Sequence, residues 1–217
     1  DSGDLRERHA KLRESQHNNP YGRGLHIDSA ENQDVLQVDV YAVLNHPFTA
    51  VASALKDPSA WCEVLILPFN TKYCHAAQAQ ADPVLQVRIG RRYDQPVEDA
   101  HRLEFAYRSV ATGPGYYESR LNATRGPVGT RDYRIVVSAI PVDGGRTFMH
   151  LSYSYAYGMA GRSAMQAYLS TAGASKVGFS MEGKDANGEP RYIGGMRGAV
   201  ERNAMRYYLA IDAFLDS

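Results

Sequence analysis

The residue types that usually carry chemistry are present in this chain, but their spacing matches no catalytic set that we recognise. The seven histidines show neither a metal-ligand spacing nor an HExxH sequence, so no metal and no cofactor is predicted. Residues 178–182, Gly-Phe-Ser-Met-Glu, lack the final glycine of a GxSxG nucleophile turn. Residues 126–130 are glycine-rich but have no lysine for a phosphate loop. The absence of a catalytic set favours binding over catalysis.

Tyrosine is the residue type that could shape a binding site. The chain has 15 tyrosines against six phenylalanines and one tryptophan. A tyrosine buries an apolar ring and keeps a hydroxyl for a partner, which suits an apolar cavity with a few polar positions. Aromatic residues are also favoured in ordinary sheets, and the sequence leaves both interpretations open.

The net charge and the length of the chain limit the classes of molecule that it is expected to bind. The chain has 217 residues, enough for one domain with extensions. Its formal net charge is zero, so no general attraction to nucleic acid is expected. No apolar run approaches the roughly 18 residues of a membrane span, although transient membrane contact stays open. Arg88, Arg91 and Arg92 form a basic cluster, for which the alternatives are an exposed face or a site for an acidic headgroup.

The two cysteines bear on the compartment. Cys62 and Cys74 are 12 residues apart, which matches no CxxC redox or zinc pattern. An even count is compatible with one disulfide and an oxidising compartment, and two buried free thiols are the alternative. The chain begins at Asp1, and a cleaved signal peptide would explain that start. We therefore expect a periplasmic or secreted protein, with a cytoplasmic one as the alternative.

The elements that must position any site follow from hydrophobic periodicity. Residues 1–33 are expected to form an N-terminal arm and turn region: 1–17 a solvated helix or mobile arm, 18–24 a turn. Residues 35–44 alternate as a first strand. Two short helices should follow, at 47–56 and 58–64, because Pro47 and Asp57-Pro58 are helix-start signals.

The middle of the chain predicts an antiparallel meander. Six alternating runs are separated by turn sequences, at 71–76, 84–92, 102–110, 116–123, 133–141 and 147–157. The last run is the densest, with large residues on one face that should turn inward. Together with the first strand this gives about seven strands.

The chain ends in a long amphipathic helix at 196–214, which carries one broad face without charge. Before it lies an insert at 158–193, with a helix expected at 160–171 and a strand pair at 176–181 and 191–193.

This order resembles the helix-grip fold of the SRPBCC superfamily, to which the START (StAR-related lipid-transfer) and birch-pollen-allergen-like proteins belong. The likeness is carried by residues 38–48, by residues 55–62 around Trp61, and by the terminal helix. It is most similar to bacterial START-like proteins of unassigned role. It implies an α+β fold with a curved sheet, two short helices after the first strand and a long C-terminal helix, in one domain at 34–217.

The resemblance also implies a deep cavity between the sheet and the terminal helix, which would bind a lipid or other hydrophobic small molecule without chemistry. The expected lining residues are Tyr107, Tyr117, Tyr133, Met149, Tyr153, Tyr155, Asn203 and Tyr207. The alternative for these rings is plain core packing, and for Asn203 a structural hydrogen bond.

Two other functions stay open. An enzyme of the aromatase/cyclase kind would need a titratable pair inside the cavity, drawn from the tyrosines with His75, His101 or His150. An interaction module would instead use the N-terminal arm and the 158–193 insert.

Overall fold

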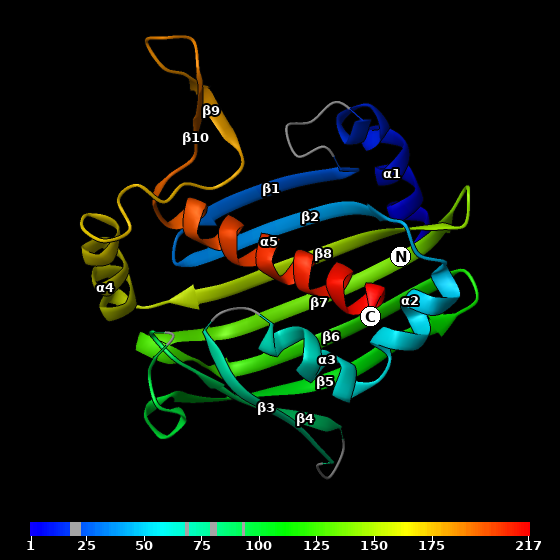
Figure 1. Ribbon diagram of the computed structural model, residues 1–217, viewed down its shortest axis with the longest axis horizontal. Coiled ribbons are helices and arrows are strands. Elements are labelled where there is room, and N and C mark those ends of the chain that lie inside the picture. Colours follow the sequence, from blue (N-terminus) through cyan, green and yellow to red (C-terminus); the bar gives the residue numbers. More distant parts are fainter. Residues whose placement is uncertain (18–22, 68–69, 79–81, 93) are drawn as a thin grey trace.

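The structure is a computed structural model that describes residues 1–17, 23–67, 70–78, 82–92 and 94–217, the side chains of 14–17 excepted. It confirms an α+β fold built on one large antiparallel sheet (Figure 1). The elements are α1 (Ser2–His17), β1 (Leu25–Asn32), β2 (Val35–Leu44), α2 (Phe48–Leu55), α3 (Pro58–Ile66), β3 (Thr71–Gln78), β4 (Pro83–Ile89), η1 (Val97–Asp99), β5 (His101–Gly113), β6 (Tyr116–Arg125), η2 (Pro127–Gly129), β7 (Thr130–Val142), β8 (Arg146–Tyr157), α4 (Met159–Leu169), β9 (Met181–Lys184), β10 (Pro190–Tyr192) and α5 (Gly195–Asp216).

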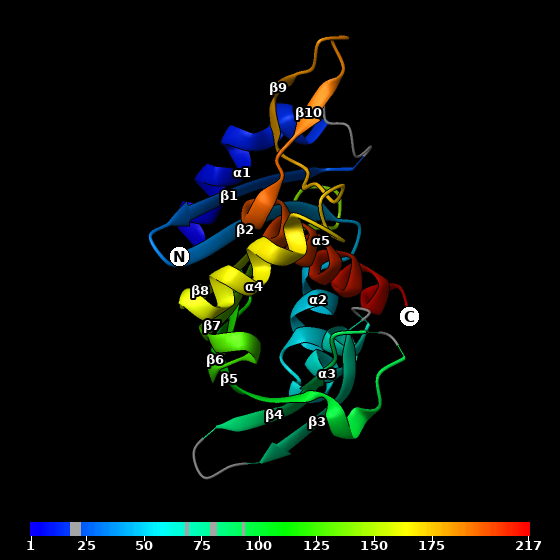
Figure 2. The ribbon, with the colours of Figure 1, turned by 90° about the vertical axis from the view of Figure 1, so that its left-hand side faces the viewer.

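The sheet has the strand order β1-β2-β8-β7-β6-β5-β4-β3. The early strand β2 therefore pairs with the last strand, β8, and the chain crosses from β2 to the far edge through α2 and α3. From β3 to β8 each strand pairs with the next, as the meander predicted. Figure 2 shows the sheet strongly bent, with α2, α3 and α5 on its concave side.

The main core fills the concave side of the sheet. Alternate residues of β2, among them Leu36, Val38 and Val40, are fully buried there and lie beside the large residues of β8. α5 covers this face over β1 and β2 and also contacts α3. Val200 and Ile211 of α5 are fully buried against the same core.

A smaller core lies on the convex side, beneath α1. Leu5 is buried with Tyr41, Ile140 and Phe148, and Leu12 is half-buried beside them. α1 is thus a helix that docks on the outer face through two leucines, where the sequence suggested a solvated helix or a mobile arm. The turn expected at 18–24 lies largely outside the described residues.

Three further elements differ from the sequence expectation. The sheet has eight strands because residues 25–32 form β1, whose polar sequence buries only Leu25 and Ile27. In the insert, β9 begins at Met181, and the preceding residues 176–180 form no strand. α4 covers 159–169, two residues short of the expected end at 171.

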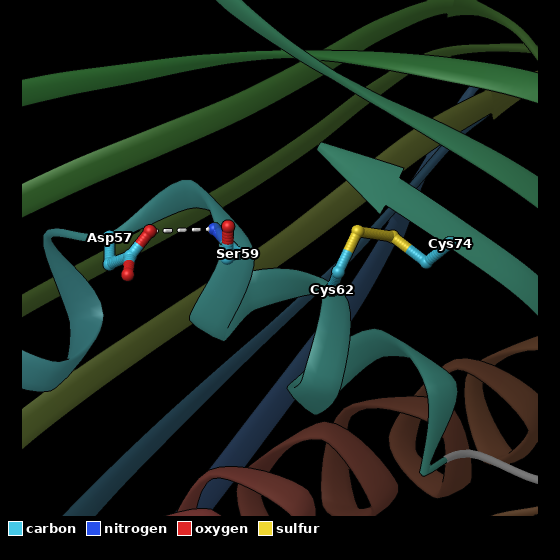
Figure 3. Close-up of a disulfide and its surroundings, with 4 residues drawn as sticks. All are labelled: Asp57, Ser59, Cys62 and Cys74. Carbon is cyan, nitrogen blue, oxygen red and sulfur yellow. Dashed lines mark hydrogen bonds between the residues drawn. A yellow bond between two sulfur atoms is a disulfide. The ribbon is translucent and has the colours of Figure 1, made fainter. Parts of the chain in front are cut away.

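The two cysteines form a disulfide. Asp57 caps α3 by accepting a 2.9 Å hydrogen bond from the backbone N–H of Ser59 (Figure 3). This start places Cys62 on α3 opposite Cys74 on β3, with their Cα atoms 5.2 Å apart. The bond ties the helical crossover to the edge strand of the sheet.

Candidate ligand site at the tyrosine cluster

Four tyrosines gather where β7, β8 and α5 meet. Tyr153 and Tyr155 lie on the inner face of β8, because residues two apart in a strand share a face. Tyr133 comes from β7, next to an irregularity in the β7–β8 register between Arg131 and Arg134. Tyr207 comes from α5. We call Tyr133, Tyr153, Tyr155 and Tyr207 the tyrosine cluster.

The rings of the cluster touch one another in the arrangements that aromatic pairs favour. Tyr133 stacks on Tyr155 with centroids 5.1 Å apart, and Tyr153 lies 5.7 Å from Tyr155. Tyr207 meets Tyr153 edge to face at 5.4 Å, so it joins α5 to the sheet. Phe105 of β5 closes the group with an edge contact to Tyr133.

The hydroxyls of the cluster are mostly unpaired. Tyr133 donates to Thr130 Oγ1 at 2.6 Å. Among the described residues, no hydrogen-bond partner is found for the hydroxyls of Tyr153, Tyr155 and Tyr207. Tyr153 and Tyr155 are each only 5% exposed. In the described chain, Ser119 Oγ is the one side-chain polar atom that is fully sealed from solvent and has no hydrogen-bond partner. The unpaired hydroxyls of Tyr153 and Tyr155 are therefore not fully sealed from solvent. The two β8 hydroxyls therefore border a space that a water-sized molecule can reach.

Burial raises the pKa of every tyrosine in the cluster. It raises the pKa of Tyr207 to about 12, and the Tyr133 hydroxyl adds to that rise. The pKa of Tyr153 lies well above the ordinary value because of burial, with Tyr207, Tyr133 and Tyr155 adding to the shift. The cluster is thus formed by aromatic rings whose hydroxyls are neutral at ordinary pH.

These raised pKa values predict alkaline instability. In an unfolded chain tyrosine ionises near pH ~10, so the contribution to stability is present below that pH and is lost as pH rises through the folded values. We expect the free energy of unfolding to fall between pH 10 and about 12, and Y153F/Y155F to flatten the fall. Denaturant unfolding across this range measures it. Tyr73→Phe, at an exposed position, should leave the profile unchanged. Phenolate absorbance that rises in one step with its midpoint near pH ~10, while the fold stays intact, would contradict the prediction.

Tyr107 and Tyr117 form a separate structural group. Both are buried, and their hydroxyls donate to the backbone oxygen of Leu55 at 3.1 and 2.5 Å. Trp61 Nε1 donates to the same oxygen at 2.7 Å. These bonds hold the end of α2 to β5 and β6. Burial raises the pKa of both tyrosines.

Met149 and Asn203 complete the expected set. Met149 is fully buried in the main core. Asn203 lies on α5, four residues before Tyr207, and is half-buried with no hydrogen-bond partner among the described residues. The structure therefore brings Tyr133, Tyr153, Tyr155 and Tyr207 together, and gives Tyr107 and Tyr117 another partner.

A buried carboxylate that the sequence did not reveal fixes the insert beside this site. Glu201 of α5 is fully buried and accepts hydrogen bonds from the backbone N–H groups of Phe179 and Ser180 at 2.9 and 2.8 Å. Its other oxygen accepts from the hydroxyl of Ser29 on β1, and Arg197 donates to that hydroxyl at 3.1 Å. Helical periodicity alone placed Glu201 on the charged side of α5.

Glu201 holds the insert so closely that Gly178 has no room for a side chain, since an added Cβ would lie 2.9 Å from the carboxylate. From the insert, Met165, Leu169 and Phe179 are half-buried against the main core. The insert thus covers part of the apolar interior near α5.

The histidines do not join the tyrosine cluster. His75 and His101 are exposed, and His150 lies on the convex side, 2.7 Å from Asp39 and stacked on Tyr41. In the described chain, only His46, Asp212 and Asp216 come close enough together to hold a metal ion. Arg23 already pairs with Asp212 at 2.9 Å, so ordinary ion pairs account for this group.

Two surface pockets lie away from the tyrosine cluster. One of about 610 Å³ lies between α1, the β7–β8 turn and α5, and one of about 470 Å³ lies on β4 and β5. Neither pocket is bordered by a residue of the tyrosine cluster.

None of the described helices has the length and apolar character needed to cross a membrane.

The element order, with two short helices after β2 and a long terminal helix across the concave face, makes this a START-like helix-grip fold. No family model and no curated protein matches the sequence. Among solved structures, a Streptomyces aromatase/cyclase is 14% identical, with a TM-score of 0.48 over 84% of this chain and 94% of the other.

Two further solved structures show the same level of similarity. A conserved protein from Geobacillus kaustophilus has 14% identity and a TM-score of 0.48, over 81% of this chain and 92% of the other. Human StAR-related lipid transfer protein 5 has 9% identity and a TM-score of 0.46, over 99% and 94%. At these values the fold assignment rests on the element order of the chain itself.

Proposed function

We propose that this protein binds a lipid or other hydrophobic small molecule between the concave sheet face and α5, at the tyrosine cluster. The observation that carries the proposal is the pair of nearly buried, unpartnered hydroxyls of Tyr153 and Tyr155, which border reachable space. A buried hydroxyl without a partner is unfavourable, so a ligand that supplies a hydrogen bond is favoured there.

The ligand has an apolar body and at least one hydrogen-bonding group. Rings line the site from β5, β7, β8 and α5. Asn203 offers an unpaired amide on the helix side. Met149 lies on β8, as Tyr153 and Tyr155 do, and packs in the main core. Tyr107 and Tyr117 hold β5 and β6 to the end of α2.

Binding without chemistry is the better-supported form of this function. An enzyme of the aromatase/cyclase kind would need a titratable partner beside the cluster, and the three candidate histidines lie at the surface or on the convex side. A disulfide is typical of oxidising compartments, which supports a periplasmic or secreted protein.

Naphthol and naphthalene form a matched pair of probes for the proposal. We expect both to bind, with naphthol binding more tightly because it can hydrogen-bond with the free hydroxyls. Y153F/Y155F should weaken naphthol binding about tenfold and leave naphthalene binding unchanged. Fluorescence titration measures both affinities.

The control is Y41F/Y73F, which removes one buried and one exposed tyrosine hydroxyl outside the cluster. It should retain the preference for naphthol. The proposal fails if neither probe saturates the protein, or if both double variants lose the preference equally.

A further inference from the structure

The pocket of about 610 Å³ is positively charged and is lined by residues of α1, the β7–β8 turn and the last turns of α5. Its walls come from five segments that are far apart in the chain. They are His9, Ala10, Arg13, Arg23, Gly24, Val43, Asn45, Asp143, Arg146, Tyr208 and Asp212.

Two arginines of this pocket, Arg13 and Arg146, keep free hydrogen-bond donors. His9 and Arg13 are four residues apart on α1, so they share one face of the helix. The His9 ring packs against Phe148 in a tilted arrangement, with centroids 4.7 Å apart. Arg146 Nε donates to the backbone oxygen of Asp143 at 3.1 Å, which fixes the guanidinium and leaves its terminal nitrogens available.

The two carboxylates that line the pocket, Asp143 and Asp212, do not neutralise its arginines. Asp212 already pairs with Arg23 at 2.9 Å. Within the described chain, Arg13 and Arg146 form no ion pair with a carboxylate, which leaves two guanidiniums against Asp143. The pKa of His9 is lowered by burial and then by Arg13 and Arg146, so their positive field reaches the imidazole.

We propose that this pocket binds an organic phosphate monoester. Arg13 of α1 and Arg146 of the β7–β8 turn both line this pocket, and guanidinium groups bind the oxygens of a phosphate group in forked geometry. The pocket is much larger than a phosphate ion, and Ala10, Val43 and Tyr208 offer apolar surface to the organic part. The site is independent of the tyrosine cluster, because none of its lining residues belongs to that cluster.

Calorimetric titration of the full chain with phenyl phosphate at low salt tests the proposal. We expect saturable binding to the unchanged protein, and binding about tenfold weaker or more to R13Q/R146Q. Inorganic phosphate should bind more weakly than phenyl phosphate, and benzoate more weakly still because it carries a single charge. Both substituted arginines are exposed, so the variant should keep the circular dichroism spectrum of the native fold.

The matched control is R6Q/R134Q, which removes the same charge from exposed positions on α1 and β7 outside the pocket. It should bind phenyl phosphate as the unchanged protein does. An equal loss in both double variants, or no saturable binding at all, would overturn the proposal. Naphthol binding should persist in R13Q/R146Q, so failure here is distinguishable from failure at the tyrosine cluster.

Discussion

Glu201→Ala should lower the free energy of unfolding by about 3–5 kcal/mol. The substitution removes the acceptor for the backbone N–H groups of Phe179 and Ser180 and for the Ser29 hydroxyl, all in a buried position. Denaturant unfolding measures the loss. Limited proteolysis should also cut within residues 170–193 first, because the insert loses its attachment to α5.

Two companion variants sharpen this test. Glu201→Gln keeps one oxygen that can accept both backbone N–H groups, so it should cost less than Glu201→Ala. Glu182→Ala removes an exposed carboxylate in the same insert and should be near neutral. A Glu201→Ala protein within about 1 kcal/mol of the unchanged protein would show that the carboxylate does not hold the insert.

Removing the disulfide should cost about 3 kcal/mol, the chain-entropy value for cysteines 12 residues apart. The variant is C62A/C74A, and denaturant unfolding of the oxidised protein, the reduced protein and the variant measures it. The reduced protein should approach the variant, which separates the cross-link from the small loss of packing at Cys62. Equal stability of the oxidised and reduced proteins would contradict the expectation.

Much of the fold could be predicted because its signals are local. The alternation in β2 and β8 gave both strands and their inner faces, and those faces meet in one register. Asp57-Pro58 is a start signal that needs no tertiary context, and the structure shows the cap it predicts. The terminal helix spans the predicted range, because its apolar stripe is long enough to define it.

The elements that escaped prediction depend on distant partners. β1 has a polar sequence, and it becomes a strand because β2 offers an unpaired edge. α1 contributes only two large aliphatic residues, Leu5 and Leu12, to the convex core, too few to mark a face by period. Glu201 looks solvated on a helical wheel, and only the insert passing over α5 buries it.

The same distinction applies to the candidate site. The period of β8 placed Tyr153 and Tyr155 on one face, and α5 brings Tyr207 to them. No local signal shows that the hydroxyls of Tyr107 and Tyr117 are taken by the Leu55 carbonyl, because that oxygen lies 52 and 62 residues away in the chain.

Nuclear magnetic resonance of the protein with isotope-labelled tyrosine rings, in complex with naphthol, tests the proposed binding site most directly. We predict intermolecular contacts from naphthol to the rings of Tyr153, Tyr155 and Tyr207, and none to Tyr41 on the convex face. Saturable naphthol binding with contacts only to Tyr41 or to the exposed Tyr73 would contradict a ligand site at the tyrosine cluster.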